Sequence, residues 1–352
     1  MPVANDGKAQ SDRIFARRAL IVIAFAALAL LAWQLRTVLV LLFGAVVMGT
    51  VFRAIAEPLS KHLRLPDGVS VLAAVLIIVG ILFGVGWLLG QQISAQTDAL
   101  AQTIPRALAE LDQWLGAFGL AHPFETWFAQ LHHSGGTLVS RFGSWLSTAS
   151  SGAANFLIVF FGGVFLASEP RFYRTGAIKL IPEAKRGVFA QALDESEHAL
   201  RLWLKGELIA MLVIGLMTGA GLWLLGVQSW LVLGILAGFF EFVPFAGPIL
   251  SAIPGILIAL VQSPQLALWT TLMYIFVQHS EAYLIQPIIQ QYAVDVPAVV
   301  LLFSLLAFAV LFGPIGILFA APLSVVSYVL VKRLYVIEAL DTPTPIPGED
   351  KG

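Results

Sequence analysis

Long hydrophobic runs without charged side chains alternate along this chain with short polar segments. A helix needs about 20 apolar residues to cross the hydrocarbon core of a bilayer, and several of the runs approach or exceed this length. The pattern therefore predicts an all-α, polytopic integral membrane protein. The first five predicted spans are residues 19–35, 37–52, 69–97, 142–168 and 208–225.

Beyond Leu225 the apolar runs continue but are interrupted by Pro and Gly. Two of these runs, 229–262 and 297–331, predict broken helical hairpins, with one helix at about 265–286 between them, which brings the total to about eight hydrophobic segments. Each hairpin is either re-entrant or fully spanning. Both arrangements place the following segment on the same side of the membrane, so the sequence leaves the choice open.

The two hairpins share a short Gly-Pro phrase at their turns, Phe245 to Pro248 in the first and Phe312 to Pro314 in the second. Interrupted helices in the two halves of a transporter point to the substrate path, because unwound backbone exposes polar groups to a ligand. A tight membrane turn built from Gly and Pro is the simpler alternative. The substrate-path candidates from these turns are Pro244, Gly247, Pro248, Gly313 and Pro314.

The distribution of Lys and Arg predicts the orientation of the chain. All but three of the 20 cationic residues precede the first span, follow the last, or lie in the connections 53–64 and 171–205. Cytoplasmic loops are enriched in Lys and Arg, so these segments and both termini are predicted to be cytoplasmic. The exceptions are Arg36, Arg106 and Arg141.

Two polar connections show helical spacing of apolar residues. Residues 93–141 predict an amphipathic segment on the outer side, and residues 169–206 a second one in the cytoplasm. Neither is expected to form a soluble domain. The predicted organisation is a cytoplasmic tail (1–18), three spans (19–92), the outer segment (93–141), a fourth span (142–168), the cytoplasmic segment (169–206), a transport half (207–331) and a cytoplasmic tail (332–352).

Composition agrees with a membrane protein and excludes several other classes. The chain has 352 residues, of which 59% are hydrophobic and 12% charged, whereas soluble proteins carry about 25% charged residues. It has no Cys, which excludes disulfides and thiolate metal sites. The sequence has no phosphate-binding loop and no catalytic motif. We therefore expect no enzyme activity, cofactor, bound metal or nucleic-acid partner.

Ionisable residues inside the apolar runs are the strongest functional candidates. From Glu207 to Val331 the chain has no Lys or Arg, yet Glu241 and Glu281 lie within long apolar runs. Such residues are costly in a bilayer and usually face a protein interior or an aqueous path. We interpret both as sites for a coupling ion, H⁺ or Na⁺, and the alternative is a neutral carboxyl that only hydrogen-bonds to nearby backbone.

Neighbouring polar residues extend the candidate site. Gln278 lies three residues before Glu281 and shares its helix face, and Gln286 is more loosely aligned with it. His279 is rotated off that face, and a packed histidine is the simpler interpretation of it. Asp295 precedes Pro297. We expect it either to cap the following helix or to take part in function.

Two further carboxylates have structural interpretations. Glu207 is predicted to open the fifth span, where a negative charge suits the helix dipole, and a place in the ion path is the alternative. Arg53 and Glu57 are four residues apart and are expected to form an ion pair at the membrane surface.

The order of short motifs resembles one known family over nearly the whole chain. The motifs are Glu57-Pro58-Leu59, Leu180-Ile181-Pro182, Trp203 to Glu207, Phe239 to Pro248, Gln278 to Glu281, Gln286 to Ile289, Gly313 to Gly316 and Ala321-Pro322-Leu323. This pattern resembles the autoinducer-2 exporter (PerM-like permease) family. It departs from the family at Glu241, because the position before Phe242-Val243-Pro244 is commonly Asn there.

The resemblance implies a secondary transporter of the bacterial inner membrane that exports a small polar solute such as autoinducer-2, assembled as a homo-oligomer. Some members are linked with sodium–proton exchange, so a Na⁺(Li⁺)/H⁺ antiporter is the second hypothesis. A membrane scaffold that transports nothing is a third, from another class of protein. The buried carboxylates argue against the scaffold, which gains nothing from them.

Overall fold

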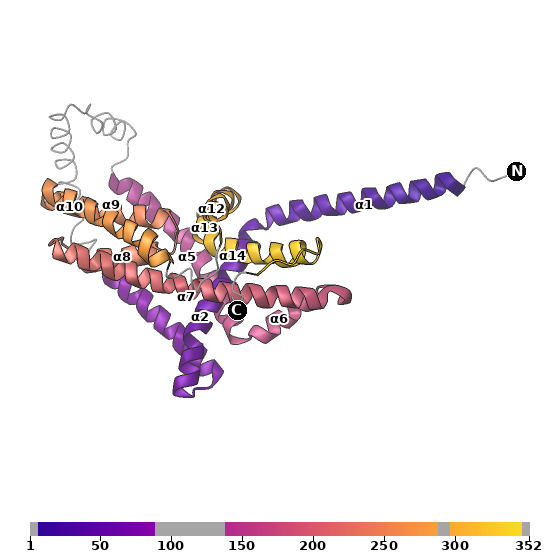
Figure 1. The fold of residues 1–352 in the computed structure, drawn as a ribbon, viewed down its shortest axis with the longest axis horizontal. Coiled ribbons are helices and arrows are strands. Elements are labelled where there is room, and N and C mark those ends of the chain that lie inside the picture. Colours follow the sequence, from indigo (N-terminus) through magenta and orange to yellow (C-terminus); the bar gives the residue numbers. More distant parts are fainter. Residues whose placement is uncertain (1–5, 89–137, 288–295, 347–352) are drawn as a thin grey trace, which may run out of the picture.

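The computed structural model describes residues 6–88, 138–287 and 296–346, and every regular element in those ranges is a helix (Figure 1). The side chains of residues 6–14, 16, 17, 25 and 138–151 lie outside this description. The predicted all-α class is confirmed. The outer amphipathic segment predicted at 93–141 lies almost entirely outside the described residues.

The first half of the chain packs around α2. Helix α1 (Asp6–Gln34) runs away from the bundle, and after one residue the chain continues into α2 (Arg36–Leu63) (Figure 1). A third helix, Asp67–Leu88, follows. Helix α5 (Leu138–Ser168) packs along α2. Gly49 on α2 and Gly163 on α5 allow the close contact, since a Cβ on Gly163 would lie 3.1 Å from the Gly49 nitrogen.

A sharp bend leads from α5 toward the longest helix. Helix α6 (Pro170–Lys179) bends by 93° from the preceding helix. A short 3₁₀ helix (Glu183–Lys185) then precedes α7 (Arg186–Leu224), which has 39 residues. From Arg186 onward, the cytoplasmic segment predicted at 169–206 and the fifth span therefore form one continuous helix, with no break at Glu207. Glu207 lies in the middle of α7, so its predicted place at a helix start is wrong.

The first predicted hairpin is present. It consists of α8 (Trp230–Phe240) and α9 (Ala246–Gln262), which pack on each other and are joined by a short turn. Helix α10 (Pro264–Ser280) follows, with Ser263 capping its first turn by accepting a hydrogen bond from Leu266 N at 3.1 Å. It continues into a π-helical segment, η2 (Glu281–Ile285).

The second broken run is also interrupted where the Gly-Pro phrase predicts. Helix α12 (Ala298–Phe312) ends at Gly313, and the chain continues through α13 (Pro314–Leu318), α14 (Ala320–Leu330) and a π-helical segment, η3 (Val331–Ile337). Gly313 has a φ of 67°, a left-handed value that glycine adopts at little cost.

Four of the described helices are long and apolar enough to span a membrane, and the bent pair of Gly152–Ser168 with Pro170–Lys179 adds a fifth candidate. In the second broken run, Ala320–Ile337 is one of the four long helices. The other apolar helices of the two broken runs are shorter. The chain is thus a multi-pass membrane protein, and its predicted total of about eight segments and the orientation of its termini stay predictions.

The largest buried cluster joins the two halves of the chain. It contains Val40 and Leu41 from α2, Val159 from α5, Leu204 from α7 and Phe319 before α14. One ion pair reinforces this junction: Arg201 Nη1 donates to Glu57 Oε1 and Oε2 at 2.6 and 2.7 Å. Glu57 therefore pairs with α7, not with Arg53 as the four-residue spacing predicts.

Candidate functional site

Glu241 lies where α8 ends and the chain turns toward α9. Its side chain is buried, with 5% of the residue exposed. Pro244 interrupts the helix three residues later, and the carbonyl of Phe240 accepts a hydrogen bond from Val243 N at 3.0 Å within the turn. The helix does not continue through this turn, so the ionisable side chain of Glu241 lies at the break.

Glu281 lies where α10 changes from α-helical to π-helical geometry. It too is buried, with 9% of the residue exposed. Gln278 Nε2 donates a hydrogen bond to Glu281 Oε2 at 2.7 Å, as the shared helix face predicts. Single-turn π segments inside α-helices occur frequently at functional sites, because the wider turn redirects the side chains that follow.

The structure brings Glu241 and Glu281 together. Their carboxyl groups lie close enough to interact electrostatically, although 40 positions separate them in the sequence. Glu207, from the middle of α7, interacts electrostatically with both. Three carboxyl groups from three elements therefore converge at the turn of the first hairpin. Nothing in the local sequence around Glu207 indicates this, since the convergence depends on how α7 packs against α8 and α10.

The turns of both hairpins depend on a glycine that lies against a backbone carbonyl. A Cβ on Gly247 would clash with Phe240 O, and a Cβ on Gly316 would clash with Phe308 O. Phe245 adopts a φ of 64°, a rare conformation for an aromatic residue. Pro244, Gly247 and Pro248 thus follow Glu241 closely in the sequence. Gly313 and Pro314 belong to the second turn.

The remaining candidates fall outside this cluster. His279 is exposed, its Nδ1 is 2.9 Å from Ile275 O, and its ring centroid is 6.1 Å from that of Tyr283. Gln286 ends the π segment and is partly buried. Asp295 lies outside the described residues.

Within the described ranges, no group of three His, Asp or Glu side chains is close enough to hold a metal ion. The three glutamates interact electrostatically without forming such a group.

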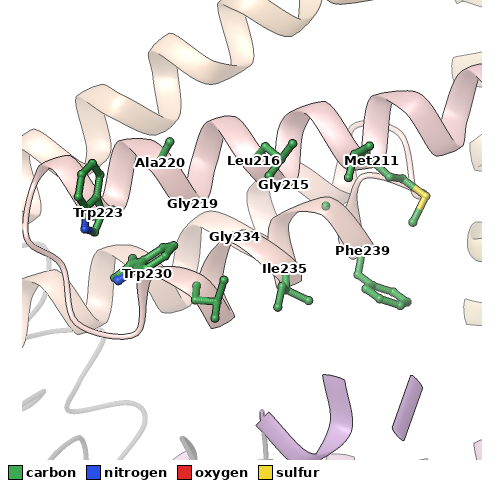
Figure 2. A pocket seen from close by; sticks show the side chains of 13 residues that line it. Met211, Gly215, Leu216, Gly219, Ala220, Trp223, Trp230, Gly234, Ile235 and Phe239 are labelled. Atoms are coloured by element: carbon green, nitrogen blue, oxygen red, sulfur yellow. The ribbon is translucent and has the colours of Figure 1, made fainter. Parts of the chain in front are cut away.

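An apolar groove of about 470 Å³ lies farther along α7 and α8 (Figure 2). Gly215 and Gly219 on α7 face Gly234 and Gly238 on α8 there, and a Cβ on Gly234 would lie 2.7 Å from the Gly219 Cα. This close packing of small residues is typical of helix pairs in membranes. The residues that line the groove include no ionisable side chain, so it is separate from the carboxyl cluster.

Comparison with known proteins agrees with the multi-pass architecture. Residues 20–335 match the family described as AI-2E family transporter. The chain belongs to the AI-2E transporter family. Its relatives include two Bacillus subtilis (strain 168) proteins described as candidate transport proteins. YrrI is 25% identical over 280 residues, covering 76% of this chain and 78% of YrrI. YueF is 20% identical over 301 residues, covering 81% of this chain and 80% of YueF.

A third relative, the candidate permease PerM of Escherichia coli (strain K12), is 27% identical over 163 residues, which is 46% of each chain. AI-2E family membership supports a role in membrane transport. The family resemblance drawn from the motifs is thus confirmed.

Proposed function

We propose that this AI-2E family protein is a secondary transporter, in which Glu241 and Glu281 bind and release the coupling ion while a small polar solute such as autoinducer-2 is exported across the bacterial inner membrane. The proximity of these two buried carboxyl groups carries the proposal. Two buried negative charges close together repel each other, so binding of a proton by one group stabilises the pair.

The position of the pair supports exchange with a substrate path. Glu241 ends α8 at the turn of a Gly/Pro-broken hairpin, and Glu281 begins a π-helical segment. Both breaks leave backbone groups without their helical partners, as in transporters whose interrupted helices bind ions and substrates. Proton loss would leave two buried negative charges side by side, which favours a rearrangement of the hairpin. Proton binding and hairpin movement are thereby coupled.

The test is transport by purified protein in proteoliposomes loaded with autoinducer-2, with an imposed pH gradient. We expect Glu281→Gln to lower gradient-driven autoinducer-2 release by about a hundredfold, the lower end of what a positioned acid–base group contributes. Glu183→Gln is the matched control, because Glu183 is an exposed carboxylate on the 3₁₀ helix before α7. Normal release by Glu281→Gln, at equal protein per vesicle, would remove the pair from the mechanism.

The same vesicles distinguish the antiporter hypothesis. Addition of Na⁺ or Li⁺ without autoinducer-2 should leave the internal pH unchanged if the organic solute is the substrate. Collapse of the pH gradient on cation addition, abolished by Glu281→Gln, would instead show a cation–proton antiporter that uses the same carboxyl pair.

A further inference from the structure

Two threonine hydroxyls are buried between helices with no hydrogen-bond partner in the described part of the chain. Thr218 on α7 and Thr270 on α10 are 0% exposed, and neither Oγ1 has a partner. Threonines in helices usually bond back to the carbonyl four residues earlier, as Thr271 Oγ1 does to Ala267 O at 2.8 Å. The hydroxyls of Thr218 and Thr270 are therefore directed into the space between helices.

The two threonines lie at matching positions relative to the carboxyl cluster. Thr218 follows Glu207 by about three helical turns on the same face of α7, and Thr270 precedes Glu281 by the same number of turns on α10. Glu207 and Glu281 interact at one end of the helix pair. Leu222 and Ala267 belong to one buried cluster at the other end. The helices are thus antiparallel, with Thr218 and Thr270 at the same level.

Tyr274 supplies a third hydroxyl between these two levels. Thr270, Tyr274 and Gln278 follow each other at four-residue steps on one face of α10. The Tyr274 hydroxyl donates to Ser251 O on α9 at 3.3 Å. Gly255, also on α9, leaves room for the phenol, because a Cβ there would meet the Tyr274 ring. Polar side chains therefore recur along this face from Gln278 to Thr270.

We propose that the contact between α7 and α10, from the glutamates to Thr218 and Thr270, is a proton path in which water molecules bridge the hydroxyl groups. This inference rests on the proposed function. Successive polar positions on α10 are about 6 Å apart along the helix, too far for direct hydrogen bonds, so the path requires water between them. Each hydroxyl accepts a proton from one side as it donates its own to the other, and none is consumed.

The path is closed at its far end. Beyond Thr218 and Thr270, the buried cluster of Leu222, Leu233, Ala259, Leu260 and Ala267 separates the threonines from the turn between α7 and α8. A proton on the carboxyl cluster therefore cannot reach the turn between α7 and α8 until α10 or the α8–α9 hairpin moves. Glu207 and Glu281 are the titratable side chains on the two facing stripes, and Glu241 joins them from α8. Tyr274 lies beside them, with its hydroxyl bonded to Ser251 O on α9.

The experiment compares Thr218→Val/Thr270→Val with Thr218→Ser/Thr270→Ser in proteoliposomes under a pH gradient. Valine has the shape of threonine, with a methyl group in place of the hydroxyl, so the valine variant should fold. We expect it to lower proton-coupled autoinducer-2 release by about tenfold, which corresponds to about 1.4 kcal/mol in the barrier, and the serine variant to retain release. Thr271→Val is the control, because its hydroxyl is bonded to its own helix.

A merely structural role gives the opposite result. Removing two unpaired buried hydroxyls should then raise the melting temperature and leave release unchanged, and that outcome would overturn the proton path. Glu281→Gln is measured in parallel. If it abolishes release while the valine variant is normal, the path fails and the proposed function stands. If Glu281→Gln itself is normal, the proposed function fails and the path with it.

Discussion

A buried carboxyl group in a membrane protein depends on the few polar neighbours that can reach it. Glu281 has one such neighbour from its own helix, Gln278, whose amide donates to Glu281 Oε2 at 2.7 Å. Gln278 therefore holds one oxygen of Glu281 in place while the carboxyl group interacts with Glu241.

This orientation predicts the effect of removing the amide. Gln278→Leu deletes the hydrogen bond that the amide donates to the Glu281 carboxylate, worth about 1.5–3 kcal/mol. Loss of this donor destabilises the charged form of Glu281, so we expect the proton concentration needed for half-maximal release to fall by about tenfold or more. The measurement is release from proteoliposomes over a range of imposed pH gradients.

His279→Leu is the matched control for Gln278→Leu, because His279 is exposed and its ring nitrogen contacts its own backbone at Ile275 O. It should transport as the unmodified protein does. A histidine variant as impaired as the glutamine variant would mean that the whole helix, and not the amide, had been disturbed.

At this scale the sequence predicted some placements and not others. Glu241 and Glu281 stand out because each is an acid inside an apolar run, and helical spacing alone puts Gln278 with Glu281. Glu207 was assigned to a helix start because charge-free windows mark a span from residue 208, whereas α7 begins at Arg186 and passes through the charged positions. Long-range pairs such as Arg201 with Glu57 leave no local signal.

At the scale of elements, the two broken hairpins share one construction. In each, a glycine removes the side chain at the point where the returning helix meets a carbonyl of the outgoing helix: Gly247 meets Phe240 O, and Gly316 meets Phe308 O. The Gly-Pro phrases therefore predicted the breaks correctly. They gave no indication of the π-helical segment at Glu281, because that geometry depends on tertiary packing around α10.

The close contacts predict large costs for small substitutions. Gly247→Ala or Gly316→Ala places a methyl group against backbone that cannot yield, and overpacking of this kind costs about 1–3 kcal/mol. We expect a lower melting temperature in detergent and a smaller monodisperse fraction on size exclusion for both variants. Gly80→Ala is the control, because no atom lies within 4 Å of a Cβ at Gly80. Alanine stabilises a helix by about 1 kcal/mol relative to glycine. Equal melting temperatures in all three would contradict a tightly packed turn.

At the scale of the whole molecule, charged contacts gather at one end of the bundle. Arg201 on α7 pairs with Glu57 on α2 at this end, and Arg174 on α6 pairs with Asp194 on α7, with Nη2 2.7 Å from Oδ2. The bend between α5 and α6 lies among the same basic residues. Residues that the positive-inside pattern assigns to the cytoplasm are thus neighbours in space, as one membrane face requires.

The orientation itself can be tested with single cysteines, because the chain has none of its own. Leu180 follows α6 and is 85% exposed, and Gln228 is exposed in the turn between α7 and α8. If the basic end is cytoplasmic, Gln228→Cys should react with a membrane-impermeant maleimide in intact spheroplasts, and Leu180→Cys only after permeabilisation. The unmodified protein, which should not react, is the control. The reverse labelling would place the basic end of the bundle outside and would contradict the predicted orientation.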